Sequence, residues 1–162
     1  MKSVVKVLLS VIIISLSSTV FAIDTLGVEL VNGNELISIN QTNLEILFNC
    51  SSVQFDSTLI AHGFEKFDEA NGVVNYIYGT MGEKWQLIGK SVFFVSVSWF
   101  DMVGKHRLTT DLRNELKSDP YTSKGKMDYY MVTINNKEYK LGASKESDYA
   151  IEDVTFGLNP NK

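Results

Sequence analysis

The 162-residue chain contains one cysteine, two histidines and two prolines. One cysteine excludes an internal disulfide, and structural zinc needs four closely placed Cys or His ligands. The chain also lacks an H-E-x-x-H motif, a G-x-S-x-G elbow and a glycine loop followed by Lys-Ser or Lys-Thr. These absences argue against zinc-peptidase, serine-hydrolase and P-loop chemistry. The sequence therefore predicts no catalytic residue, no metal site and no cofactor.

Two weaker patterns carry little chemistry. Ser123 and Lys126 form an S-x-x-K match, but no second element of a Ser/Lys acyl-transfer site accompanies it. Glu65, Asp68 and Glu69 lie close together without the alternating spacing and glycine hinge of a calcium loop. We interpret these three acids as a solvated surface.

Long apolar runs are confined to the N-terminus. Lys2 and Lys6 flank the start of an apolar run over residues 7–16, and Val20 and Ala22 occupy the −3 and −1 positions of a cut after residue 22. This order is typical of a secretory signal peptide. The run is shorter than the roughly 20 residues of a spanning helix. An uncleaved N-terminal anchor is the alternative.

We therefore expect residues 1–22 to be a signal peptide and residues 23–162 to form a single domain, with 159–162 a frayed tail. The predicted location is periplasmic or extracellular, in a bacterium. The leader holds two lysines and no carboxylate, so its removal changes the net charge from −4 to −6. No segment gathers Lys and Arg on one stripe, which argues against binding to nucleic acid or anionic lipid by charge. Nothing here indicates the oligomeric state.

The lone cysteine, Cys50, allows three interpretations. An unpaired cysteine often packs as a small apolar side chain, which we favour. An odd cysteine in an exported protein also suggests a disulfide between chains. A catalytic thiol would need a neighbouring histidine, either His62 or His106, and neither stands in a recognisable cysteine-protease context.

The first part of the mature chain predicts a hairpin, a helix and a strand. Asn32-Gly33 suits a tight turn between strands at 28–31 and 35–39. Thr42 and Glu45 form a capping box that predicts a helix over 43–50. Alternation of apolar and polar residues predicts a strand over 53–59, and His62 has an ordinary turn role after it.

The rest of the chain is dominated by short strands. Leu108, Leu112 and Leu116 predict a second helix, which Pro120 ends. The charged stretch at 64–71 is left unassigned. The remaining strands are expected at 73–78, 85–88, 91–100, 130–134, 137–141 and 149–158. The predicted fold is α+β and β-dominated: an antiparallel sheet, possibly curled, with one or two short helices packed on it. A β-barrel or sandwich is the alternative.

The chain is rich in aromatics, with nine Phe, seven Tyr and two Trp. Tyr76, Tyr78, Met81 and Trp85 surround one loop, and such residues are enriched at interfaces. We take these four as the candidate partner-binding residues. The predicted function is that of a small exported protein that binds another protein, such as an inhibitor or immunity-type protein. A small envelope-acting hydrolase and a small-ligand or lipid carrier are the alternatives.

Overall fold

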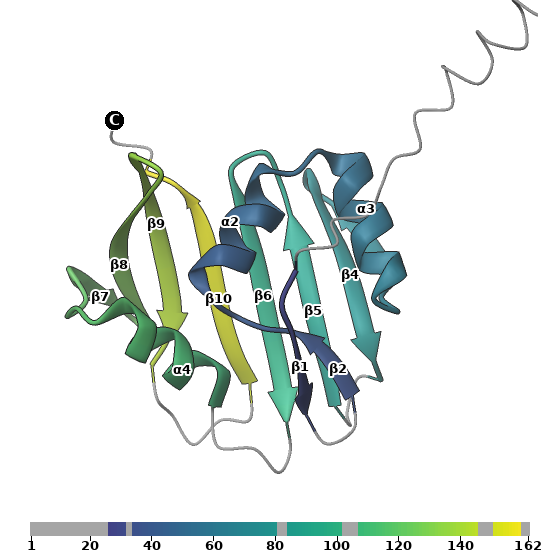
Figure 1. Ribbon diagram of the computed structural model, residues 1–162, viewed down its shortest axis with the longest axis horizontal. Helices are drawn as coiled ribbons and strands as arrows, with labels where there is room; N and C mark the ends of the chain where they lie inside the picture. The colour runs from purple at the N-terminus through teal and green to yellow at the C-terminus, as the bar shows by residue number, and fades with distance from the viewer. Residues whose placement is uncertain (1–25, 32–33, 81–83, 102–106, 146–150, 160–162) are drawn as a thin grey trace, which may run out of the picture.

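The structure is a computed structural model that describes residues 26–31, 34–80, 84–101, 107–145 and 151–159. Each of its helices and strands is ten residues long or shorter (Figure 1). In chain order they are β1 (Val28–Val31), β2 (Asn34–Ile37), α2 (Gln41–Asn49), α3 (Ser52–Ala61), β3 (Glu65–Ala70), β4 (Val73–Gly79), β5 (Lys84–Lys90), β6 (Phe94–Asp101), α4 (Arg107–Leu116), β7 (Thr122–Lys124), β8 (Met127–Ile134), β9 (Lys137–Ser144) and β10 (Ile151–Leu158).

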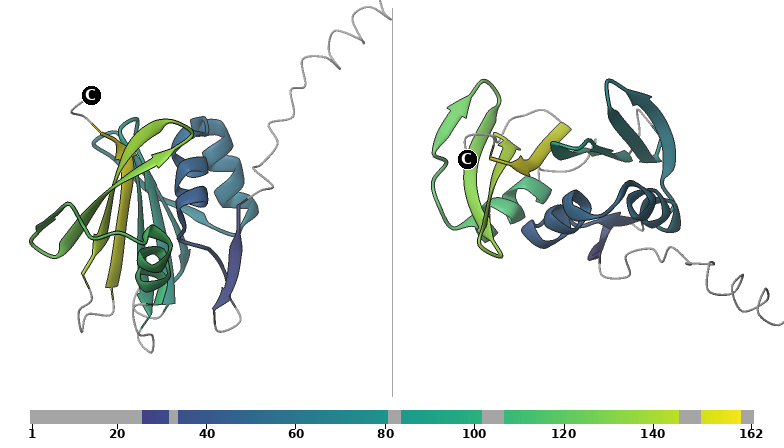
Figure 2. Two further views of the ribbon diagram at one scale, coloured as in Figure 1. Left: turned by 60° about the vertical axis from the view of Figure 1, so that its left-hand side comes forward. Right: turned by 90° about the horizontal axis from the view of Figure 1, so that it is seen from above.

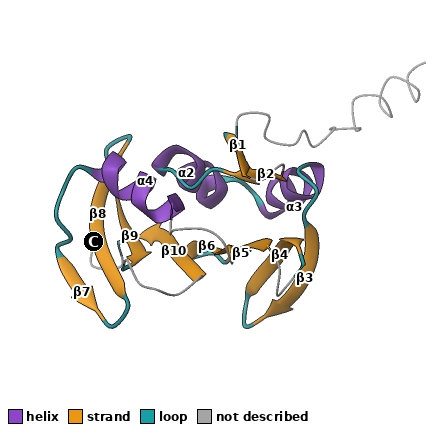
Figure 3. Ribbon diagram, turned by 90° about the horizontal axis from the view of Figure 1, so that it is seen from below, coloured by secondary structure: helices purple, strands orange, loops and turns teal. Residues whose placement is uncertain are grey.

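One eight-stranded antiparallel sheet dominates the fold, in the order β3-β4-β5-β6-β10-β9-β8-β7. The hairpin β1-β2 forms a separate two-stranded sheet. The hairpin and the three helices lie on one side of the large sheet (Figures 2 and 3). The prediction of a β-dominated α+β fold is confirmed, and the sheet is open rather than curled or closed into a barrel.

The strand registers assign every residue of the sheet to one of two faces. Directly opposed residues of antiparallel strands share a face, and side chains alternate along each strand. The row Tyr76, Ile88, Val97, Val154 and Ala143 runs across five strands. All five side chains are buried, and the helices lie over this face. The core is therefore the layer between this face of the sheet and the helices.

Helix α2 begins at a different cap from the one predicted. The side chain of Asn40, not Thr42, accepts from the backbone N–H of Asn43 at 2.8 Å. This start buries Asn43, whose amide bonds the backbone of Gly27 and Ser38. The helix prediction is confirmed, but the predicted cap is wrong: Asn40 caps equally well two residues earlier, and this start leaves Asn43 to anchor the N-terminal hairpin.

The segment predicted as a strand at 53–59 is helix α3. Ser51 and Gln54 form a complete capping box at its start. Phe55, Thr58 and Leu59 lie three or four residues apart and are buried on one face of this helix. Phe55 and Leu59 satisfy both the strand period and the helix period, which is why alternation misled the prediction.

The hairpin β1-β2 is fixed to the sheet by one buried amide. Gln86 on β5 is fully buried. Its Oε1 accepts from the Ile37 N–H at 3.1 Å, and its Nε2 donates to the Ile37 carbonyl at 2.8 Å. The side chain thus supplies both hydrogen bonds that a neighbouring strand would have made.

Other strand predictions need smaller corrections. The unassigned charged stretch is the edge strand β3, all six residues of which are exposed. Strand β6 begins at Phe94, so residues 91–93 lie in the turn before it rather than in the strand predicted over 91–100. Strand β7 was not predicted. The predicted helix around Leu112 is confirmed as α4.

Several predictions fall outside the described residues. They are the signal peptide at 1–22, Met81, His106 and the tail beyond residue 159. Within the described ranges, none of the helices has the length and apolar character needed to cross a membrane.

Candidate functional site

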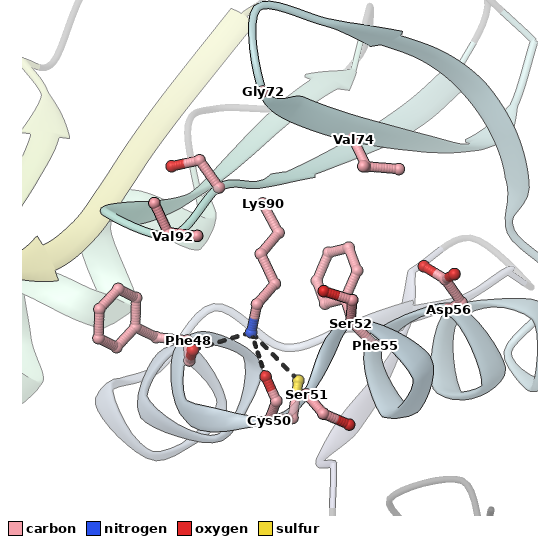
Figure 4. A pocket seen from close by; sticks show the side chains of 11 residues that line it. Phe48, Cys50, Ser51, Ser52, Phe55, Asp56, Gly72, Val74, Lys90 and Val92 are labelled. Atoms are coloured by element: carbon pink, nitrogen blue, oxygen red, sulfur yellow. Dashed lines mark hydrogen bonds between the residues drawn. The ribbon is translucent and has the colours of Figure 1, made fainter.

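A pocket of about 330 Å³ opens where the α2–α3 junction meets two turns of the sheet (Figure 4). The turns are those between β3 and β4 and between β5 and β6. The walls of the pocket mix apolar and polar side chains, and the polar ones come from the α2–α3 junction, from α3 and from the end of β5 with the turn after it. The lining residues are Phe48, Cys50, Ser51, Ser52, Phe55, Asp56, Gly72, Val74, Lys90, Ser91 and Val92.

Lys90 crosses the pocket from β5 to the end of helix α2 (Figure 4). Its Nζ donates to the backbone carbonyls of Leu47, Phe48 and Cys50, the last two at 2.8 and 2.7 Å. Carbonyls at a helix C-terminus have no partner within the helix and carry partial negative charge. Lys90 therefore caps α2, and its three N–H donors are all engaged.

Cys50 is partly exposed in this pocket rather than fully buried as predicted. Its Sγ donates to the Leu47 carbonyl at 3.1 Å and lies 3.4 Å from Lys90 Nζ. Burial raises the pKa of the thiol, and the neighbouring ammonium opposes this shift without cancelling it. His62 caps the far end of α3, about 15 Å along a ten-residue helix. Within the described residues, therefore, no histidine lies beside the thiol to support the catalytic interpretation.

Asp56 lies on α3 at the opposite side of the pocket from Phe48 (Figure 4). Its carboxylate accepts a hydrogen bond from the phenol of Tyr76. Burial and this hydrogen bond raise the pKa of Tyr76 to about 12. Tyr76 also packs edge-on against Phe55 at 5.8 Å between ring centroids. Tyr76 therefore interacts with two successive residues of α3, Phe55 and Asp56.

Beside the pocket, the β5–β6 turn presents two exposed apolar side chains. Val92 is 82% exposed and Phe93 76% exposed, and we call these two residues the apolar tip. The turn is held by Ser91, whose N–H donates to the Phe94 carbonyl at 2.9 Å. The Ser91 hydroxyl also accepts from the N–H groups of Phe93 and Phe94. The apolar tip is therefore displayed on a turn with fixed backbone geometry.

The four predicted partner-binding residues do not gather on one surface. Tyr76 is buried on the covered face of the sheet, and Tyr78 packs against Phe64 on the same face. Trp85 lies on the opposite face, stacked on Phe100 at 5.8 Å. Met81 lies outside the described residues. The binding role of these four residues stays a prediction.

Sequence reasoning did not find the apolar tip. The signal was present, because Val92 and Phe93 follow a strand at a position where turns usually carry Gly, Asn or Asp. The long apolar run that begins at residue 91 concealed it, since Phe93 also continues the strand alternation. The pocket has no comparable signal, because its residues come from three separate segments of the chain.

The weaker sequence patterns have structural roles. Ser123 donates to Asp128 at 2.6 Å, and the same carboxylate lies 3.6 Å from Arg113. In the part of the chain that the structure describes, no group of three His, Cys, Asp or Glu side chains could hold a metal ion.

Comparisons of the chain with protein-family models, with curated proteins and with solved structures find no match.

Proposed function

We propose that the protein is exported and acts by binding another protein through the apolar tip and the adjacent pocket. The observation that carries this proposal is the exposure of Val92 and Phe93 on a turn held by Ser91. Exposed aromatic side chains on a rigid backbone lose little conformational entropy on binding, which favours affinity. The tip would enter a hollow in the partner, and the pocket would receive a partner side chain against Phe48 and Phe55.

An inhibitor or immunity-type protein is the specific form of this proposal. Such proteins need a preorganised surface that blocks an enzyme, with no chemistry of their own. The sequence supports this form because it holds no recognisable catalytic or cofactor motif. Export rests on the N-terminal sequence pattern of residues 1–22.

The test is a capture experiment with matched variants. The protein is immobilised and exposed to envelope and secreted extracts of the source cells. A partner should be retained by the wild type and lost with Val92→Ser/Phe93→Ser. The control is Leu30→Ser/Ile60→Ser, which removes two apolar side chains that are 72% and 61% exposed elsewhere. Equal retention by the tip variant and the wild type would refute the role of the tip.

Binding of a small ligand in the pocket is the second candidate function. A volume of about 330 Å³ is at the lower end of the range for small-molecule sites, roughly 300–1,000 Å³. Lys90 uses its three donors within the protein, so the ligand would be mainly apolar and would meet Asp56 and the serine hydroxyls at its polar end. Native mass spectrometry of the purified protein would detect a retained ligand, and its absence would count against this function.

A further inference from the structure

The face of the sheet opposite the helices carries a second candidate surface, which we call the open face. The registers place Trp85, Phe100 and Ile151 in one row across it. The next row contains Ile77 and Leu87, followed by Ser98 and Asp153. The three helices and the hairpin β1-β2 all lie on the other side (Figure 3). Aromatic and aliphatic side chains are therefore presented here with none of the described helices over them.

Charge on the open face is unevenly distributed. The registers put Glu65 and Asp68 of β3 and Asp153 of β10 on this face. Among the described side chains of β3, β4, β5, β6 and β10, no lysine or arginine shares it, because Lys66 and Lys90 belong to the covered rows. The lysines of the open face stand on β9 and β7. We call the five-strand part the acidic half.

Two of the three acids named in this half are held by hydrogen bonds. Asp68 accepts from the Asn75 amide at 2.6 Å, and Asp153 accepts from the Ser98 hydroxyl at 2.6 Å. Each hydrogen bond engages one carboxylate oxygen and leaves the other to accept from a binding partner. On the strands between β3 and β10, but one row further along than Asp153 and two rows further than Asp68, Trp85 and Phe100 stack with an angle of only 13° between their rings. The acidic half thus combines oriented carboxylates with flat aromatic surface.

We propose that the acidic half of the open face binds an arginine-rich segment of another protein. The guanidinium group fits both features, because it pairs with carboxylates through two hydrogen bonds and stacks on aromatic rings. Five strands spaced by about 4.8 Å span roughly 20 Å, which an extended segment of about six residues crosses. A second copy of this chain does not fit, because it has two arginines in all, and Arg113 is engaged by Asp128 and Ser144.

This surface is independent of the proposed function. The pocket, which Val92 also lines, lies against helices α2 and α3, whereas the acidic half is on the face of the sheet away from the helices. The two surfaces can therefore fail or succeed separately in experiments.

The tryptophans provide a local reporter for the test. The chain has two, and Trp99 is buried on the covered face while Trp85 lies on the open face. In a Trp99→Phe background, fluorescence reports the open face alone. Titration with a deca-arginine peptide should change this emission, and deca-lysine should bind at least tenfold more weakly because it cannot stack. Equal affinity for the two peptides would overturn the proposal.

Charge variants locate the binding site. Asp68→Asn/Asp153→Asn should weaken deca-arginine binding at least tenfold, while the matched pair Glu45→Gln/Glu115→Gln on the helix side should leave it unchanged. Equal losses in the two pairs would mean nonspecific attraction and would overturn the proposal. The variant Val92→Ser/Phe93→Ser should bind the peptide like the wild type, which separates this surface from the apolar tip. A dimer in sedimentation velocity that Trp85→Ala dissociates would show that a second copy covers this face, again against the proposal.

Discussion

The two faces of the eight-stranded sheet use polar side chains in opposite ways. On the covered face, Gln86 forms hydrogen bonds to the backbone of Ile37, and Lys90 donates to backbone carbonyls at the end of α2. On the open face, Asp68 and Asp153 are each oriented by one neighbour. Burying a polar group without a partner is costly, so polar residues of the covered face must be paired within the fold. Polar residues of the open face carry no such requirement.

The difference indicates where function is to be sought. Lys90 lines the pocket and lies 3.4 Å from a thiol, which resembles a reactive pair. Its three bonds to carbonyls show that it holds α2 onto the sheet instead. The hydrogen bonds of Asp68 and Asp153 are exposed, and Val92 and Phe93 are exposed side chains, which is why we propose these residues for binding.

The difference between the two faces of the sheet predicts its largest effect at Lys90, whose replacement should lower the stability of the fold. Lys90→Met leaves three carbonyls at the end of α2 without their donor and should lower the free energy of unfolding by about 3 kcal/mol. Lys140→Met on the open face removes a lysine that lies 4.4 Å above the ring of Tyr129. It should cost less than about 1 kcal/mol. Urea denaturation measures both, and similar losses in the two variants would contradict the contrast.

A slightly smaller effect is expected at Gln86. Gln86→Met removes the two hydrogen bonds to Ile37 and leaves a buried N–H and a buried carbonyl unpaired, a cost of about 2 kcal/mol. Hydrogen exchange should also show earlier opening of the hairpin β1-β2. Asn75→Ala is the control, because it removes one exposed hydrogen bond to Asp68 and should change stability by less than about 1 kcal/mol.

Two glycines of the open face lie where an added Cβ would come too close to neighbouring atoms. A Cβ at Gly157 would lie 2.3 Å from the backbone carbonyl of Phe93, whereas one at Gly142 would meet the side-chain oxygen of Thr155 at 2.7 Å. Backbone yields less readily than a side chain, so Gly157→Ala should cost about 2 kcal/mol and Gly142→Ala about 1 kcal/mol. Thermal unfolding checks the order. Adding Thr155→Ala should restore part of the loss at Gly142, and no rescue would show that the Tyr129 ring is the obstacle.

The sequence predicted the sheet better than the helices that cover it. Strands such as β6 and β9 alternate apolar and polar residues because one of their faces is buried, and this periodicity is visible in the chain. Helix α3 was missed because Phe55 and Leu59 fit both periods. Its capping box, Ser51 with Gln54, was the signal that distinguishes them. Strand β3 was missed because exposed edge strands often carry charge instead of alternation.

The candidate sites were harder to predict than the fold. The pocket depends on the packing of the α2–α3 junction against two turns, and no local pattern announces that packing. The grouping of Tyr76, Tyr78 and Trp85 rested on nearness in sequence. Trp85 on β5 pairs with Gly79 on β4, one position away from Tyr78. Because side chains alternate along a strand, Trp85 lies on the opposite face from Tyr76 and Tyr78. Only the apolar tip had a signal in the sequence itself.

The smallest expected effect is the pH dependence of the Cys50 thiol. Because burial raises its pKa, the protonated thiol is favoured in the folded protein relative to the unfolded chain. The stability that this adds is complete below the unfolded thiol pKa, about 8.5, and is lost as the pH rises from there through the folded pKa. A thiol reagent should therefore label the native protein more slowly than a cysteine peptide at pH 8, with the difference narrowing at higher pH. Cys50→Ser should flatten the fall in stability above pH 8.5, since serine does not titrate there. Labelling as fast as the peptide at pH 8 would mean that Lys90 outweighs burial, and the lysine would then act on the thiol as well as on the helix.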